Sequence, residues 1–245
     1  MLKKIFSILL ILVVCSAYFF SCKKYPPTTS DPTRNFFPLT FGQYVTYDVD
    51  SIYYLDSCQQ YEIKSQLKYV ITDTTRDKND SVIYILNVFT RQYDGDIWQS
   101  QGYNVALSIR ANADSICVTQ DGNTYTKMKF PVTESYNWAG NYVVQYQIPT
   151  NAYLQGWNYQ YQKLHLPFND NLHNYQNTVT VLEDDESVNY PSVDSAVPAY
   201  RTYAKEVYAY NIGMIYKEWT HWTYSPNSSK CVKGYTVIMR AVDHN

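Results

Sequence analysis

Charged residues are scarce in this chain, and neither sign of charge dominates. Asp, Glu, Lys and Arg make up 17% of its 245 residues, and the formal net charge is −2. A surface that binds nucleic acid needs a stripe of Lys and Arg, and no part of the sequence supplies one. We therefore expect no nucleic-acid partner.

Motifs that mark common catalytic sites are absent as well. The sequence contains no HExxH, GxSxG, Walker, GxGxxG or EF-hand pattern, so neither an enzyme nor a cofactor is predicted. One weak metal candidate is a run of carboxylates that offers the hard oxygen ligands preferred by calcium. Such a run more often lies at a solvated strand end or edge. Its residues are Glu183, Asp184, Asp185 and Glu186.

Cysteine is limited to five residues and never forms a CxxC pair, which argues against a zinc ribbon or a CxxC redox site. Cys15 and Cys22 lie in or beside an N-terminal apolar run. The other three, Cys58, Cys117 and Cys231, are an odd number, so at least one has no partner within the chain in an oxidising compartment. Cys58 and Cys231 are a candidate pair, but the sequence alone leaves the pairing open.

The N-terminal apolar run has the form of a secretory signal. It follows the basic residues Lys3 and Lys4, extends from residue 5 to residue 20, and is short for a helix that spans a membrane. Ser21-Cys22 at its end resembles the lipobox of bacterial lipoproteins, in which the cysteine is acylated. An uncleaved anchor helix is the alternative interpretation.

These features predict three segments. Residues 1–21 are expected to form the signal peptide, residues 22–35 a lipidated Cys22 with a flexible tether, and residues 36–245 the folded body. Acyl chains at Cys22 would anchor the protein to the outer membrane, and we expect the body to face the periplasm.

The residue present in excess is tyrosine, with 27 copies, and this composition favours strands over helices. Residues 43–51 alternate between apolar and polar types, as a half-buried strand does. Asp121-Gly122 predicts a tight hairpin between residues 115–120 and 124–130. Further strands are expected at residues 67–71, 82–89, 157–161, 178–182 and 235–242.

Residues 207–224 are interpreted as one strand bent at Gly213, whereas residues 200–210 could instead contain a short helix because Ala204-Lys205-Glu206 are helix formers. Roughly ten strands with short turns predict a single antiparallel all-β domain. A sheet of that size hides its edges by curling, so we expect a curved half-barrel or a closed barrel.

Four segments resemble, in the same order, the motifs of a family of uncharacterised Bacteroidota envelope lipoproteins. Residues 37–51 resemble FPLxxGNxWxYxVDS and residues 130–141 resemble FPVxxGxxWxGN; residues 180–186 and 208–218 resemble TVLxDDE and YAxxVGxVYKE. The chain departs from the family at Gln43, Val45 and Ser135. The family has no established activity, so the resemblance implies an envelope location and an architecture. Gly42, Gly213 and Trp138 would then have structural roles.

Aromatic residues that alternate with amides suit the recognition of sugars, because rings stack on sugar faces and amides bond hydroxyls. The same rings could instead fill the core of the sheet. The candidate ligand-facing aromatics are Trp157, Tyr159, Tyr161, Trp219 and Trp222.

A repeated triplet, Asp-Ser or Asp-Thr before a small or aliphatic residue, resembles the O-glycosylation sequon of secreted Bacteroidota proteins. The alternative is that Asp-Ser marks turns before strands. The candidate hydroxyls belong to Ser51, Thr74, Ser81, Ser115 and Ser195.

The sequence therefore favours an envelope lipoprotein without enzymatic activity, whose barrel binds an apolar or amphipathic ligand or a partner protein. The first alternative is a structural or assembly subunit of an outer-membrane complex. A weaker alternative is a protein that binds or acts on glycans.

Overall fold

The computed structural model describes residues 31–245 except 96, 102–106, 142, 145–148 and 229. The predicted signal peptide, Cys22 and most of the tether lie outside the described residues. Apart from the short 3₁₀ helices η1 (Pro32–Phe36) and η3 (Pro149–Leu154), the described elements are strands. None of the helices among these residues is both long enough and apolar enough to cross a membrane.

The strands form one antiparallel sheet, which confirms the all-β prediction. The sheet order is β7-β6-β5-β3-β2-β1-β13-β12-β11-β10-β9-β8, and the two-residue strand β4 pairs with β3. The bounds are β1 (Tyr44–Tyr54), β2 (Gln60–Arg76), β3 (Val82–Gln92), β4 (Gln99–Ser100), β5 (Leu107–Ala111), β6 (Ser115–Gln120), β7 (Asn123–Lys129), β8 (Asn137–Ala139), β9 (Asn158–Asn169), β10 (Asn174–Val188), β11 (Ala199–Ala209), β12 (Gly213–Tyr224) and β13 (Val232–His244).

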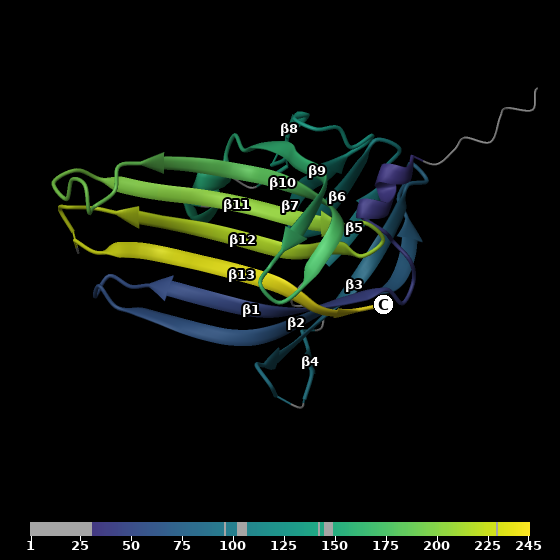
Figure 1. The fold of residues 1–245 in the computed structure, drawn as a ribbon, viewed down its shortest axis with the longest axis horizontal. Helices are drawn as coiled ribbons and strands as arrows, with labels where there is room; N and C mark the ends of the chain where they lie inside the picture. Colours follow the sequence, from purple (N-terminus) through teal and green to yellow (C-terminus); the bar gives the residue numbers. More distant parts are fainter. Residues whose placement is uncertain (1–30, 96, 102–106, 142, 145–148, 229) are drawn as a thin grey trace, which may run out of the picture. The chain divides into compact units, whose positions relative to one another are not determined.

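The two edges of this sheet meet, so the body is a nearly closed barrel. The amide of Thr126 on β7 donates to the carbonyl of Gly140, just after β8, at 2.8 Å, and the amide of Thr124 donates to that of Val143 at 2.8 Å. Figure 1 shows the short strands curling round at one end, while β1, β2 and β10–β13 run side by side and extend past them. Closure satisfies backbone groups that an open edge would leave exposed.

Local sequence explains the hairpins. Asp121 and Gly122 have φ of 50° and 79°, as a two-residue hairpin with positive φ at both positions requires, so the predicted hairpin between β6 and β7 is confirmed. Asn211 and Gly213, on either side of Ile212, have positive φ angles of 65° and 101°. This turn separates β11 from β12, so the prediction of one bent strand over residues 207–224 is wrong.

The alternative of a helix at residues 200–210 is also wrong, because this segment lies in β11. The helix-forming residues Ala204, Lys205 and Glu206 do not form a helix here, since almost the whole of β11 pairs with β10 on one side and β12 on the other. Pairing on both sides outweighs local helix propensity.

Two apolar clusters stabilise the barrel. The larger one fills the interior and includes the fully buried rings of Tyr159 and Tyr161 on β9. The smaller one includes Val207 and Ile215, against which the β9–β10 hairpin packs with Phe168 and Tyr175. Figure 1 shows this hairpin crossing β12 and β13.

A disulfide joins Cys58, in the turn after β1, to Cys231, in the turn before β13. The two cysteines are 173 residues apart in the sequence, and their Cα atoms lie 4.9 Å apart. The structure thus selects the candidate pair that the sequence left open, and Cys117 is the free cysteine of the described body.

Candidate functional site

A cavity of about 140 Å³, partly open to solvent, lies within the barrel. Its wall is mainly apolar and includes Leu86, Leu107 and Ile109 from strands β3 and β5. For comparison, an apolar cavity of ~150 Å³ in another protein holds a benzene molecule. The cavity is therefore large enough for a small apolar group.

The segment before β1 and the turn before β12 form another part of the cavity lining. Phe37, Pro38 and Leu39 come directly after η1, Ile212 comes from the β11–β12 turn, and Gly213 is the first residue of β12. The N-terminal end of the body therefore lies beside the cavity.

Four charged side chains form an internal ion cluster, which we define as Lys127, Glu183, Glu206 and Lys217. Lys127 Nζ donates to Glu183 Oε1 at 2.5 Å and to Glu206 Oε1 at 2.9 Å, and Lys217 Nζ donates to the same Glu206 oxygen at 2.9 Å. Tyr208 Oη donates to the other oxygen of Glu206 at 2.5 Å. Lys127, Glu206 and Lys217 line the cavity.

Each member of the internal ion cluster has a local structural origin. Glu206 and Lys217 are directly opposite residues of β11 and β12, where opposite charges pair favourably. Glu183 lies at an irregularity of β10, where the register with β11 shifts between Leu182 and Asp184. Lys127 comes from β7 and reaches across the interior, since β7 is not a neighbour of β10 or β11 in the sheet.

Burial shifts the two carboxyl groups in opposite directions. Desolvation, followed by the nearby charge of Glu206, raises the pKa of Glu183 to about 7. Burial alone would also raise the pKa of Glu206, but the charges of Lys127 and Lys217 outweigh it and hold this pKa well below its usual range. The difference follows from the contacts, because Glu206 has three donors whereas Oε2 of Glu183 is buried without a hydrogen-bond partner among the described residues.

Lys127 stays charged despite its burial. Desolvation lowers the pKa of its ammonium group, but Glu183 and Glu206 outweigh this effect and raise the pKa well above its ordinary value. Burial and the charge of Glu206 likewise raise the pKa of the Tyr208 hydroxyl, so Tyr208 acts as a donor. At neutral pH the cavity is thus lined by two ammonium groups and one carboxylate.

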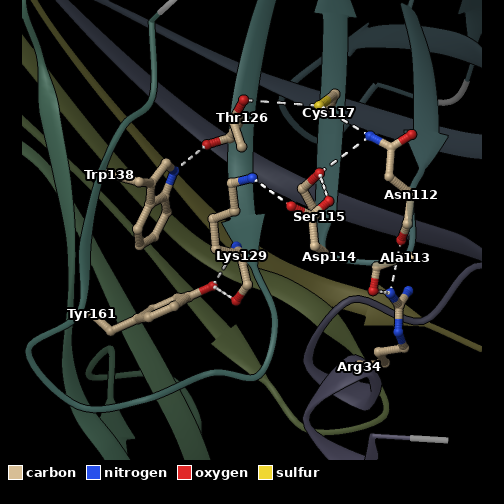
Figure 2. A network of polar contacts seen from close by, with 10 residues as sticks. All are labelled: Arg34, Asn112, Ala113, Asp114, Ser115, Cys117, Thr126, Lys129, Trp138 and Tyr161. Carbon is tan, nitrogen blue, oxygen red and sulfur yellow. Dashed lines mark hydrogen bonds and ion pairs between the residues drawn. The ribbon is translucent and has the colours of Figure 1, made fainter.

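A separate network of polar contacts, whose residues do not line the cavity, helps to hold the barrel closed (Figure 2). Trp138 Nε1 donates to the carbonyl of Thr126 at 2.7 Å, and Tyr161 Oη donates to the carbonyl of Lys129 at 2.7 Å. Both bonds attach β8 or β9 to β7. Arg34 of η1 donates to the carbonyls of Asn112 and Ala113, which attaches the N-terminal segment to the β5–β6 turn.

The predicted ligand-facing aromatics lie mostly inside the protein. Tyr159 and Tyr161 have no exposed surface, and Trp157 is 4% exposed. Trp157 packs against Trp219, with ring centroids 5.3 Å apart, whereas Trp222 contacts Tyr190. The structure therefore brings four of the five candidates into one core and separates Trp222 from them.

The predicted modification sites differ in accessibility. Ser195 is exposed in the β10–β11 loop and Thr74 is exposed on β2. Ser51 and Ser81 are half-buried. Ser115 is 4% exposed and its hydroxyl donates to Asp114, so it is the least accessible of the five.

The four carboxylates of the weak calcium candidate do not converge. Glu183 is in the internal ion cluster, Asp185 pairs with Arg201 at 2.5 Å, and Glu186 accepts from the Tyr200 hydroxyl at 2.6 Å. Burial raises the pKa of Asp184 to about 6. No group of three or more metal-ligating side chains occurs among the residues that the structure describes.

Sequence reasoning missed Lys127, Glu206, Lys217 and Tyr208. The available signal was a charged residue on an otherwise uncharged face of a strand, such as Glu206 between Ala204 and Tyr208 in the period-two alternation. Alternation places such a residue on one face, but it does not say that the face is the interior.

The fold and the cavity define a class of protein, an antiparallel β-barrel with a small charged and apolar interior site. No protein-family model matches the chain, and no curated protein matches it significantly. One similar crystal structure is described as a "putative exported protein with YmcC-like fold" from Bacteroides fragilis NCTC 9343. It is 11% identical, with a TM-score of 0.38 over 84% of this chain and 98% of that chain. Similarity this low supports no inference of shared function.

Proposed function

We propose that this protein is a cell-envelope lipoprotein whose barrel binds a small amphipathic ligand. The observation that carries this proposal is the cavity of about 140 Å³, with its apolar wall and its charged residues Lys127, Glu206 and Lys217. Small-molecule sites typically combine an apolar lining with a few well-placed polar groups. Burial of an apolar group there stabilises the complex by about 25 cal/mol per Å² removed from water.

The proposed location rests on the N-terminal sequence, in which Cys22 is the candidate for lipidation. The Cys58–Cys231 disulfide supports an oxidising compartment such as the periplasm. Substitution Cys22→Ser should abolish incorporation of labelled fatty acid and release the protein from the outer-membrane fraction. Labelling that persists in this variant would contradict lipidation at Cys22.

Native mass spectrometry of the full-length protein, released from membranes with detergent, tests the binding function. A small molecule bound in a one-to-one ratio is expected in the wild type. Ile109→Phe should displace it, because Ile109 lines the cavity and is 5% exposed. Ile85→Phe is the matched control, since Ile85 is 37% exposed and is not among the lining residues.

Two results would contradict the binding function. One is a wild-type protein that never carries a small molecule, even when amphiphiles are supplied in excess. The other is equal loss of the bound molecule in Ile109→Phe and Ile85→Phe, which would indicate an effect on stability instead of filling of the cavity.

A specific observation also favours the second function, an assembly subunit. The β10–β11 loop and its flanking strand end expose four apolar side chains. These are Val188 at 48%, Tyr190 at 43%, Val193 at 82% and Val197 at 42% exposed. A cluster of this kind is typical of a contact surface. A photo-reactive probe at position 192 should then form a crosslink to a partner protein, and Val193→Asp should abolish that crosslink. An unchanged crosslink would argue against this loop as the contact surface.

A further inference from the structure

We infer that the ligand of the cavity is a small amphiphile with a carboxylate head, which binds beside Lys217 and Lys127 while its apolar part fills the cavity. This inference rests on the proposed binding function and adds the chemical class of the ligand. Three observations carry it: the hydrogen-bond capacity of the internal ion cluster, the charge of the cavity lining, and the cavity volume.

Hydrogen-bond capacity favours a head group that accepts. An ammonium group has three donors. Lys127 uses two of them on Glu183 and Glu206, and Lys217 uses one on Glu206, as far as the described residues show. Glu206, by contrast, already accepts at both oxygens. The lining of the cavity therefore offers several unused donors and a carboxylate whose main acceptor positions are taken.

The charge of the lining favours an anionic head. Lys127, Lys217 and Glu206 line the cavity and together carry a charge of +1, which is the charge of the whole internal ion cluster when Glu183 is protonated; when Glu183 is ionised, the cluster is neutral. One monoanionic carboxylate balances this charge, and a cationic head would add to it. Lys217 is the better contact, because its side chain is 20% exposed while that of Lys127 is 8% exposed.

Glu183 can compensate the charge that the ligand brings. Its Oε2 is buried without a hydrogen-bond partner among the described residues, and burial raises its pKa to about 7. Above about pH 7, where Glu183 is ionised, entry of a carboxylate would favour uptake of one proton from solvent at Glu183, which keeps the buried charge constant; near pH 6 Glu183 already holds this proton. The ionisable groups whose charges act on or respond to Glu183 are Lys127 and Tyr125 on β7, Tyr159 on β9, Glu206 and Tyr208 on β11, and Lys217 on β12.

The volume limits the apolar part. About 140 Å³ is close to the ~150 Å³ that accommodates benzene in another protein, so we expect an apolar group of about six carbons. Hexanoate, 1-hexanol and hexylammonium are therefore suitable probes, because each has about six carbons and they differ in the head. Hexanoate has one methylene fewer in its alkyl chain than the other two, so tighter binding of hexanoate cannot come from a larger apolar part.

The three probes would be titrated calorimetrically into the full-length protein in lipid nanodiscs at about pH 6, with empty nanodiscs as the reference. The affinity for hexanoate should exceed that for 1-hexanol by a factor of about ten or more, and hexylammonium should have the lowest affinity. Lys217→Met should reduce the affinity for hexanoate to that for 1-hexanol, and Lys217→Arg should retain most of it. Lys205→Met is the control, because Lys205 pairs with Glu218 and does not line the cavity.

The outcomes separate this inference from the binding function. Equal affinities for hexanoate and 1-hexanol, or tightest binding of hexylammonium, would overturn the carboxylate head but leave the cavity as a binding site. Failure of the folded wild type to bind any of the three would overturn both. An affinity for hexanoate that does not fall as pH rises through 7 would overturn the role of Glu183, and Glu183→Gln should remove that dependence.

Discussion

Strands β11 and β12 carry two Lys–Glu pairs in neighbouring registers, and the two pairs differ in environment. Glu206 lies opposite Lys217, and Lys205 lies opposite Glu218. The Nζ-to-carboxylate distances are 2.9 Å and 3.0 Å, so the geometry is nearly the same. The Glu206 side chain, however, is 3% exposed, whereas those of Lys205 and Glu218 are 24% and 26% exposed.

The comparison shows that burial, and not contact geometry, decides how strongly an ion pair affects stability and the ionisation of its neighbours. On the outer face, solvent screens the charges, and such pairs contribute little to stability. Inside the barrel, the loss of hydration makes each unpaired charge costly, so the partners determine which groups stay ionised. The internal ion cluster is therefore coupled to stability, to pH and to any ligand in the cavity.

The largest loss in the free energy of unfolding should come from removing Lys127, which belongs to the inner cluster. Lys127→Met leaves Glu183 and Glu206 buried with one lysine fewer, and we expect a loss of about 3–5 kcal/mol in the free energy of unfolding. Urea unfolding would measure it. The double variant Lys127→Met/Glu183→Gln should recover part of the loss. A cost below about 1 kcal/mol would mean that the inner cluster is as weak as the outer pair.

The inner cluster should also make stability depend on pH in a way that the outer pair does not. The pKa of Glu183 rises from 4.5 to about 7 on folding, so the folded state keeps a proton that the unfolded chain has released between these values. The contribution of Glu183 to stability is therefore lost as pH rises through this window, by about 3 kcal/mol.

Glu183→Gln tests this dependence, because glutamine cannot ionise. Relative to the wild type, the variant should become more stable by about 3 kcal/mol as pH rises from ~4 to ~8. Urea unfolding at a series of pH values would measure the difference. Two parallel stability curves would show that Glu183 titrates normally.

Removing one neutral donor from the inner cluster should have a smaller effect. Tyr208→Phe deletes the hydrogen bond to Glu206 Oε2 and leaves the ring in place. We expect a loss of about 1.5–3 kcal/mol, the range for hydrogen bonds to charged groups. Tyr200→Phe is the control, because its hydroxyl donates to Glu186 in an exposed setting. Equal losses of stability for Tyr208→Phe and Tyr200→Phe in thermal unfolding would show that burial does not strengthen the effect of losing this hydrogen bond.

The smallest effect is expected on the outer face. Lys205→Met breaks the pair with Glu218, and we expect a change of about 0.2–1 kcal/mol in the free energy of unfolding. Addition of salt should reduce the difference between variant and wild type, since exposed pairs are screened. A loss of several kcal/mol would show that the two faces are not as different as their exposure suggests.

Local sequence was sufficient for most of the longer strands and for one hairpin, but it did not predict β4, β5 and β8. Alternation at residues 43–51 predicted β1, and Asp121-Gly122 placed the turn between β6 and β7, because two positive φ angles suit few other residue pairs. It was not sufficient at residues 207–224, where one strand was predicted instead of the end of β11 and the whole of β12. Gly213 signals a positive φ, but the sequence does not say whether the chain bends or reverses there.

The sequence by itself determined an antiparallel all-β body, because tyrosine, β-branched residues and period-two alternation act over a few neighbouring residues. Only the tertiary structure decided that Lys127, Glu183, Glu206 and Lys217 meet, since they come from β7, β10, β11 and β12. Their meeting requires closure of the barrel and the register shift at Glu183, which set which face becomes the interior. These are long-range properties, and no local pattern encodes them.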